Sequence, residues 1–163
     1  MRTVQWLFVV SVVLFISGIG FIVAGARATR MATPRPVDTP ATTPIASIKQ
    51  IMNGIVMPNA TVVYDAVGTT ISGDRVEETF PRNDKEWAAV SDSAAALVES
   101  GNLLLLGDRA VDNGDWVRMT REFISAGKVV LEAAEEKKAD GIFMAGGDLN
   151  ATCDSCHEKY QRR

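Results

Sequence analysis

The residues best suited to chemistry lie together near the C-terminus. The segment Cys153-Asp154-Ser155-Cys156-His157 contains both cysteines and the only histidine of the 163-residue chain. Its C-x-x-C-H spacing is that of covalent haem c attachment. On a helix, thiols at positions i and i+3 face the same way, so each can add to one vinyl group of a porphyrin while His157 binds the iron through an imidazole nitrogen. The motif therefore predicts one covalent haem c, held by Cys153 and Cys156, with His157 as an iron ligand.

Other uses of these residues fit less well. A thioredoxin-like dithiol needs a βαβ setting, for which the sequence shows no pattern. A structural disulfide would leave the histidine unexplained, and zinc would usually need a third cysteine, a second histidine or a carboxylate. Two cysteines and one histidine also exclude a four-thiolate iron–sulfur cluster and a bis-histidine haem. Beyond the motif no nucleophile, base or metal cluster is evident, so we expect that the protein is not an enzyme.

Apolar residues recur at helical spacing from residue 45 onward. The first predicted helix, 45–67, starts with Thr43 as N-cap and Pro44 in its first turn, and Pro58 should kink it near 55–56. The remaining predicted helices are 84–111, with a capping-box-like start at Asn83, 115–138, with Asp115 as N-cap, and 140–163.

Residues 68–82 lack a clear period and are predicted to form a loop with at most a short turn. Four amphipathic helices, the last three joined by short turns, predict an all-α fold with a four-helix bundle over residues 45–163. The expected core positions are Ile48, Met52, Ile55, Val62 and Ala66, then Trp87, Val90, Ala94, Leu97, Gly101 and Leu104, then Trp116, Met119, Phe123, Gly127, Val130 and Ala134, and finally Ile142, Ala145, Leu149, Cys153, Cys156 and Tyr160.

The N-terminal segment has a different character. Residues 4–26 carry no charge, and as a helix they would be about 34 Å long, enough to cross a bilayer core. We favour a single retained transmembrane anchor over residues 1–28, because the apolar run exceeds the length usual in a signal peptide. The alternative is a signal peptide cleaved at the small residues of 24–28. Residues 29–44, rich in Pro and Thr, are expected to be a tether.

The charge balance limits the partners. The whole chain has a formal charge of −3, and without residues 1–30 it has 14 basic and 20 acidic residues, a charge of −6. A mildly acidic surface gives no indication of nucleic-acid binding and permits a partner with a basic patch.

A helical bundle with C-x-x-C-H in its last helix resembles the class II c-type cytochromes, which comprise cytochrome c-prime and its low-spin relatives. The resemblance covers about residues 45–163, and CDSCHEKY at 153–160 is its specific part. It implies that His157 is the proximal ligand, with Tyr160 as the aromatic residue that follows. The family usually has a basic residue four positions after the histidine, where this chain has Gln161.

The same resemblance implies that the first helix crosses the distal face of the haem. Low-spin members place a Met sulfur there, and high-spin members an apolar residue. Met52, in the segment KQIM, matches the low-spin position best and is our expected sixth ligand, whereas core packing is the alternative. Met57 lies off the expected stripe, and Met119 and Met144 are expected only to pack. Four further positions that could make room for a flat macrocycle are Gly101, Gly127, Gly146 and Gly147.

The expected function is that of an exported monohaem cytochrome. It would carry electrons between redox partners at the outer face of the bacterial cytoplasmic membrane, tethered in the periplasm, or soluble there after cleavage. One alternative is a five-coordinate haem protein that binds small gases such as NO or CO. Another is a haem-bearing accessory subunit of a respiratory or photosynthetic membrane complex. Proteins of the family it resembles often form homodimers, so a homodimer is allowed here too.

Overall fold

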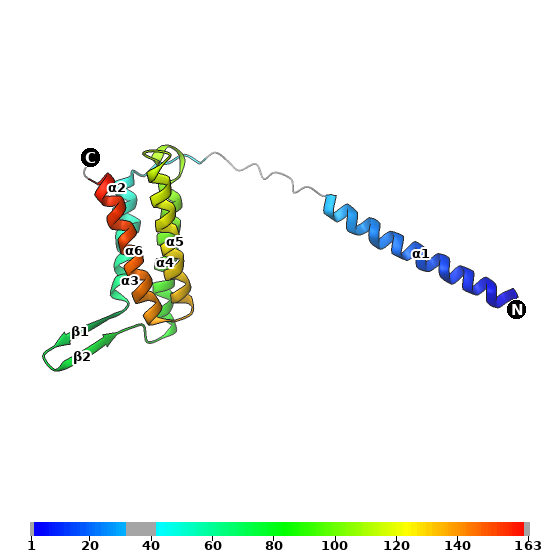
Figure 1. The fold of residues 1–163 in the computed structure, drawn as a ribbon, viewed down its shortest axis with the longest axis horizontal. Coiled ribbons are helices and arrows are strands. Elements are labelled where there is room, and N and C mark those ends of the chain that lie inside the picture. The colour runs from blue at the N-terminus through cyan, green and yellow to red at the C-terminus, as the bar shows by residue number, and fades with distance from the viewer. Residues whose placement is uncertain (1, 32–41, 162–163) are drawn as a thin grey trace. The chain divides into compact units, whose positions relative to one another are not determined.

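The computed structural model describes the backbone of residues 2–31 and 42–161, and within the first range the side chains of residues 2–17 (Figure 1). The chain divides into two compact units, Met1–Pro40 and Ala41–Arg163, which are considered separately. The predicted tether falls largely on residues 32–41, which lie outside the described residues.

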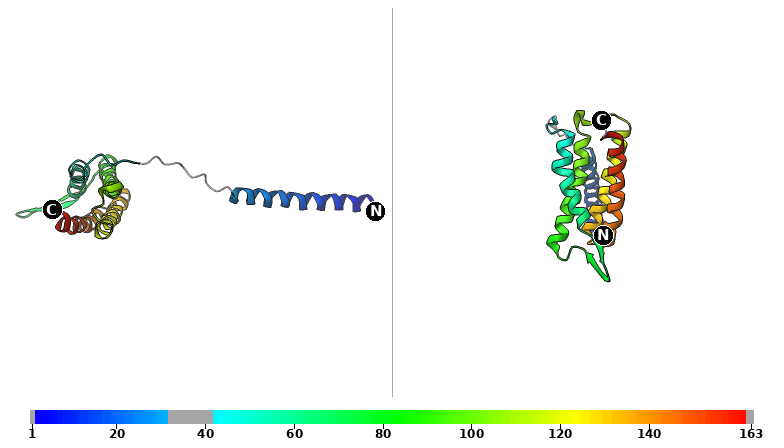
Figure 2. Two further views of the ribbon diagram at one scale, coloured as in Figure 1. Left: turned by 90° about the horizontal axis from the view of Figure 1, so that it is seen from above. Right: turned by 90° about the vertical axis from the view of Figure 1, so that its left-hand side faces the viewer.

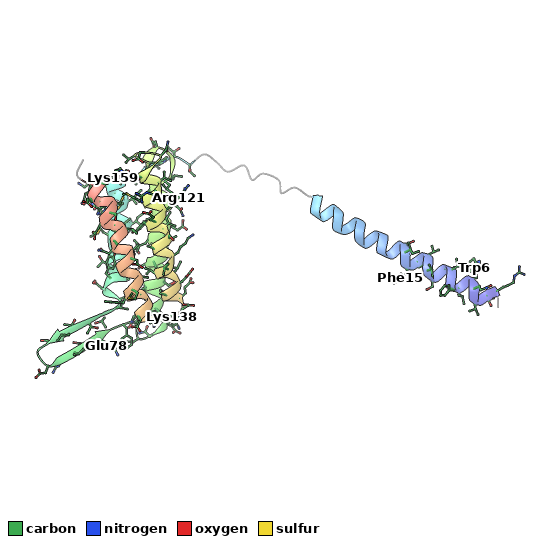
Figure 3. All side chains as sticks on the ribbon, in the orientation of Figure 1. Trp6, Phe15, Glu78, Arg121, Lys138 and Lys159 are labelled. Carbon is green, nitrogen blue, oxygen red and sulfur yellow. The ribbon has the colours of Figure 1, made fainter. Side chains whose placement is uncertain are left out.

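The first unit contains one helix, α1 (Arg2–Met31). Its described side chains are exposed, among them Trp6 and Phe15, which project from the helix in Figure 3. A helix over the apolar segment is therefore confirmed. In the described part of the chain, no helix meets the length and apolarity required to cross a membrane.

The second unit is built mainly from helices, which confirms the all-α prediction. Figure 2 shows them side by side, with α4 against α5, α5 against α6, and α3 between α4 and α6. The contacts of α3 with α6 are sparser than those of the other neighbouring pairs. The helices are α2 (Ile48–Ile51), a π-helical turn η1 (Met52–Val56), α3 (Met57–Asp65), α4 (Asp84–Leu104), a 3₁₀ turn η2 (Gly107–Arg109), α5 (Asp115–Glu135) and α6 (Ala139–Tyr160).

The first helical arm, α2–η1–α3, begins at Ile48, three residues later than predicted. Ser47 is its N-cap: the Gln50 N–H donates to Ser47 Oγ (3.3 Å), and the Ser47 N–H donates to Gln50 Oε1 (2.8 Å). This capping box satisfies two backbone donors, which a start at Thr43 and Pro44 would not provide. The predicted start was therefore wrong.

The irregularity predicted at Pro58 takes the form of the π turn. The Met57 N–H donates to the Met52 carbonyl five residues back, and Pro58 follows without an N–H of its own. The extra residue in this turn shifts the buried face. The buried residues are Ile51, Val56, Ala60 and Val63, whereas in the predicted stripe Ile48, Met52, Ile55 and Ala66 are only partly buried and Val62 is exposed.

The prediction of a loop over residues 68–82 was wrong. Strands β1 (Gly68–Ser72) and β2 (Arg75–Thr79) form an antiparallel hairpin in which Ile71 faces Val76. The two-residue turn places Gly73 at φ +61°, a backbone conformation that glycine adopts without strain, and such turns suit the twist of a hairpin. The hairpin projects from the end of the bundle where α3 ends (Figure 1).

The apolar stripes predicted for α4 and α5 form the core. All six expected residues of α4 are buried, as are five of the six in α5, where Met119 is half-buried. In α6 the first three expected residues are buried, and Cys153, Cys156 and Tyr160 are half-buried.

Boundaries of α4 and α5 also differ from the sequence prediction. Helix α4 ends at Leu104 rather than at residue 111, before Gly107 with φ +63°. Helix α5 has Gly114 as its N-cap rather than Asp115. The Asp112 carboxylate satisfies its first turn by accepting from the N–H groups of Gly114 (2.9 Å) and Trp116 (3.1 Å).

Two helix glycines allow α4 and α5 to approach closely. A Cβ on Gly101 would lie 2.4 Å from Ile124 Cγ1, and one on Gly127 would lie 3.1 Å from Val98 Cγ2. These glycines therefore serve helix packing, and the expectation that they make room for a macrocycle is wrong.

Substitution at Gly101 tests this packing. Gly101→Ala should lower the free energy of unfolding by about 1–2 kcal/mol, because overpacking outweighs the gain in helix propensity. The matched control is Gly147→Ala on α6, where nothing lies near the added methyl group and the gain should be about 0.5–1 kcal/mol. Chemical denaturation measures both, and equal stabilisation by the two substitutions would refute the packing role.

Candidate haem-binding site

The C-terminal half of α6 carries the three residues of the motif on one face. Cys153, Cys156 and His157 are half-buried and line a single cavity of about 210 Å³. Both cysteines are free thiols. The spacing of three and four residues brings these side chains to the same side of the helix, as the sequence predicts.

The rest of the cavity wall comes from the other helices. The first arm lies across from α6, α5 contributes one side, and Leu104 of α4 contributes at its end. Most of the lining is apolar. Besides the motif residues and Leu104, the lining residues are Met52, Val56, Met57, Ala60 and Tyr64 of the first arm, Met119, Thr120 and Phe123 of α5, and Asn150, Thr152 and Asp154 of α6.

Three methionine side chains reach this cavity. Met52, the predicted sixth ligand, lines it, is half-buried and packs against the core. Met57 lines it too but is 60% exposed. Met119, expected only to pack, is half-buried and lines the cavity as well. Met144 lies apart, 71% exposed, in a second, more open hollow between α3 and α6.

The π turn explains why Met52 and Met57 line the same cavity. In an α-helix, residues five apart point about 140° away from each other, at 100° per residue. In η1 the backbone hydrogen bond joins these two residues directly, which brings their side chains toward the same side. Pro58 thus places two thioethers where an uninterrupted helix would place one.

The thiols lie in surroundings that favour their neutral form. Burial raises the pKa of the Cys153 thiol, and the hydrogen bonds from Tyr64 and Thr152 only partly oppose it. Burial, and next the charge of Cys153, raise the pKa of Cys156. Burial, followed by the neighbouring Cys153, also raises the pKa of the Tyr64 hydroxyl.

Neutral thiols fit a haem better than a metal ion. Zinc needs thiolates, whereas addition of a thiol to a vinyl group leaves the sulfur uncharged as a thioether. In the described part of the chain, no group of three or more His, Cys, Asp and Glu side chains could hold a metal ion. An apolar wall, two thiols, one imidazole and nearby thioethers are a donor set that suits covalent haem.

A polar network fixes the end of α6 that carries the motif. The Tyr160 hydroxyl donates to Asp112 Oδ2 (2.5 Å), while Asp112 Oδ1 caps α5 as described above. The Trp116 Nε1–H donates to the Leu104 carbonyl (3.1 Å). The rings of Trp116 and Tyr160 pack edge to face, with their centroids 5.1 Å apart. His157 lies one helical turn before Tyr160, so the network holds its helix against the connection between α4 and α5.

Ion pairs stabilise the same contact between the end of α6 and the start of α5. Lys159 pairs with Asp115, which also pairs with Arg118, and the hydrogen bond from Lys159 is the largest cause of the lowered pKa of Asp115. Sequence reasoning missed the Asp112–Tyr160 contact, because its partners are 48 residues apart and no local pattern connects them.

Comparisons with known proteins give partial support for the predicted relationship. A stretch of 46 residues, 28% of this chain, is 39% identical to cytochrome c' of Allochromatium vinosum. This similarity supports a distant relationship to cytochrome c'. It covers 30% of that protein, so the relationship extends to part of it only, and it suggests a haem c cofactor. No protein-family model matches the chain, and no solved structure matches it.

The Asp112–Tyr160 contact predicts an acid sensitivity. The hydrogen bond from Tyr160, followed by that from the Trp116 N–H, holds the pKa of Asp112 below its ordinary value. A carboxyl with a lowered pKa in the folded state stabilises the fold above about pH 4, and this contribution is lost as the pH falls further. Asp112→Asn should therefore reduce the loss of thermal stability between about pH 4 and pH 2.

The controls are the single variant Tyr160→Phe and the double variant that combines it with Asp112→Asn, each compared with the unsubstituted protein. Tyr160→Phe should reduce the same acid dependence, and the double variant should add little, because both changes remove one interaction. Thermal melts followed by circular dichroism across the pH series measure this. Identical pH profiles for all four proteins would contradict the proposed contribution of the contact.

Proposed function

We propose that this chain is a cytochrome c'-like protein that carries one covalent haem c and transfers electrons between protein partners. The observation that supports it best is the presence of Cys153, Cys156 and His157 in one largely apolar cavity that also contains thioethers. A bound haem would supply the change of oxidation state. Cys153 and Cys156 would hold its ring, His157 Nε2 or Nδ1 would bind the iron, and the apolar wall would exclude water.

Met52 is the proposed sixth ligand. It lies on the first arm, which forms the wall across from α6, and its packing against the core restricts its side chain. Met57 is largely exposed and therefore less restrained. A methionine sulfur would be a ligand that raises the reduction potential of a bound haem, which suits an electron carrier.

Gas binding is the second candidate. Val56, Ala60 and Phe123 give the cavity an apolar wall on the first arm and α5. If Met52 only packs, this wall leaves a coordination position open to a small uncharged ligand such as NO or CO. The two candidates therefore differ in one iron ligand.

The proposed location is outside the cytoplasm, because bacteria attach haem c covalently on the outer side of the cytoplasmic membrane. The apolar run in residues 4–26 would direct export, as a signal peptide or as an anchor. The acidic balance of residues 31–163 favours a redox partner with basic groups around its docking site. Membership of a larger membrane complex as an accessory subunit fits the same features.

The iron ligand can be tested by optical spectroscopy of the purified holoprotein in both oxidation states. We expect a low-spin spectrum with the red absorption band of a methionine–iron bond. Met52→Ala should convert it to a high-spin spectrum and lower the reduction potential by on the order of 0.1 V, within the range that axial ligands span.

Met57→Ala and Met119→Ala are the matched controls, because both remove a thioether from the same cavity. Their spectra should keep the low-spin form. A native high-spin spectrum that Met52→Ala leaves unchanged would refute methionine ligation, and CO binding to the reduced protein without loss of a ligand would then favour the gas-binding candidate.

Export can be tested through haem attachment. A chain without residues 2–26 should remain in the cytoplasm and gain no covalent haem, measured by haem staining after denaturing electrophoresis. Replacement of these residues by an unrelated export signal should restore the stain. Haem attachment to the truncated chain without any such signal would contradict the proposed location.

A further inference from the structure

The β1–β2 hairpin has no role in the proposed haem site. It projects from the bundle, and every residue from Thr69 to Phe80 is exposed. The facing pair Ile71 and Val76 is 72% and 62% exposed. Figure 3 shows Glu78 of the hairpin and Lys159, which follows the haem motif, at opposite ends of the bundle. A two-stranded hairpin is marginally stable alone in water, so this one would gain from a further strand.

The register shows which backbone groups are available at the edge of β1. Ser72 and Arg75 flank the two-residue turn and form a hydrogen-bonded pair, and such pairs alternate along an antiparallel hairpin. Gly68, Thr70 and Ser72 therefore direct their N–H and C=O groups toward β2. Those of Thr69 and Ile71 point to the outer edge, where no strand of the described chain pairs with them.

The two edges of the hairpin differ in charge. Strand β2 carries Arg75, Glu77 and Glu78, and charged side chains protect an edge against pairing. Strand β1 has the sequence GTTIS, with no charge and three β-branched residues. Only the β1 edge is therefore suited to accept another strand.

We propose that β1 pairs with β1 of a second copy of this chain, antiparallel and related by a two-fold axis at Thr70. In this register Thr69 faces Ile71 of the second copy, and Ile71 faces its Thr69. Both residues direct their backbone groups outward, so two hydrogen-bonded pairs form, with Thr70 opposite Thr70 between them. The result is a continuous four-stranded sheet with the β2 strands at its charged edges.

Side-chain chemistry selects this arrangement. The same two-fold pairing through β2 would place Glu77 opposite Glu77, and like charges directly opposite are destabilising. Pairing through β1 brings Ile71 and Val76 of both copies to one face, where the four side chains can shield one another from water. An interface of this kind is isologous, as two-fold dimers require, and it leaves the haem-bearing end of each bundle free for a redox partner.

Cysteine cross-linking tests the proposed register in the full chain. Facing residues of a non-hydrogen-bonded pair have Cα atoms about 4.5 Å apart, which lies within the range for a disulfide. Under mild oxidation, Thr70→Cys should give mostly covalent dimers on non-reducing gels. Glu77→Cys, on the neighbouring strand and the same face, is the matched control and should remain at the background set by the unsubstituted protein with Cys153 and Cys156.

A charge substitution tests the dimer itself. Thr70→Glu would place two carboxylates opposite each other at the axis and should raise the dimer dissociation constant at least tenfold, measured by sedimentation equilibrium in one detergent for all variants. Glu77→Gln should leave it unchanged, and helical circular dichroism checks the fold. The proposal is wrong if the unsubstituted protein is monomeric at the highest concentration, if Thr70→Glu leaves the dimer intact, or if Thr70→Cys cross-links no better than Glu77→Cys.

Discussion

The geometry of the site depends on one missing hydrogen-bond donor. Pro58 has no N–H to donate to the carbonyl of Gly54, and the chain widens the preceding turn into the π helix η1. This turn lets the first arm face two environments: Ile51 and Val56 are buried in the core, while Met52 and Met57, next to Val56, line the cavity. A regular helix could bury residues at 3–4 spacing in the core, but it would not direct both thioethers toward α6. The irregularity therefore connects the packing of the bundle to the placement of the thioethers that are proposed as iron ligands.

The cavity lies where the bundle is least tightly closed. Helices α4 and α5 meet at Gly101 and Gly127 with almost no space between them, whereas α3 and α6 make sparse contacts. What fixes α6 near the motif is a contact at its end, from Tyr160 to Asp112. Because this contact lies at the end of α6, it holds the motif in place without filling the space next to it. A group inserted between the first arm and α6 would therefore meet preformed walls on both sides.

The regular parts of the fold and the placement of Cys153, Cys156 and His157 on one side of one helix were predictable, and the irregular parts were not. The stripes of α4 and α5 follow strict 3–4 spacing, so burial could be assigned residue by residue. The π turn displaced the core face of the first arm from Met52 and Ile55 to Ile51 and Val56, because spacing rules assume 3.6 residues per turn. The hairpin depended on the turn chemistry of Gly73, which outweighed a weak strand pattern. Contacts across the sequence, such as Met119 with the cavity, leave no local signal.

The cavity also carries an energetic argument for an apolar ligand. The lining of this cavity is mostly apolar, and apolar ligand surface buried against it would contribute about 25 cal/mol per Å² removed from water. A ligand that fills the space and binds only the folded chain would therefore stabilise the fold. Partial burial keeps the Cys153 and Cys156 thiols in their neutral form, and the wall is mostly carbon, so charged ligands would gain little there. A porphyrin could instead bring its apolar edge to the thiols and its iron to His157.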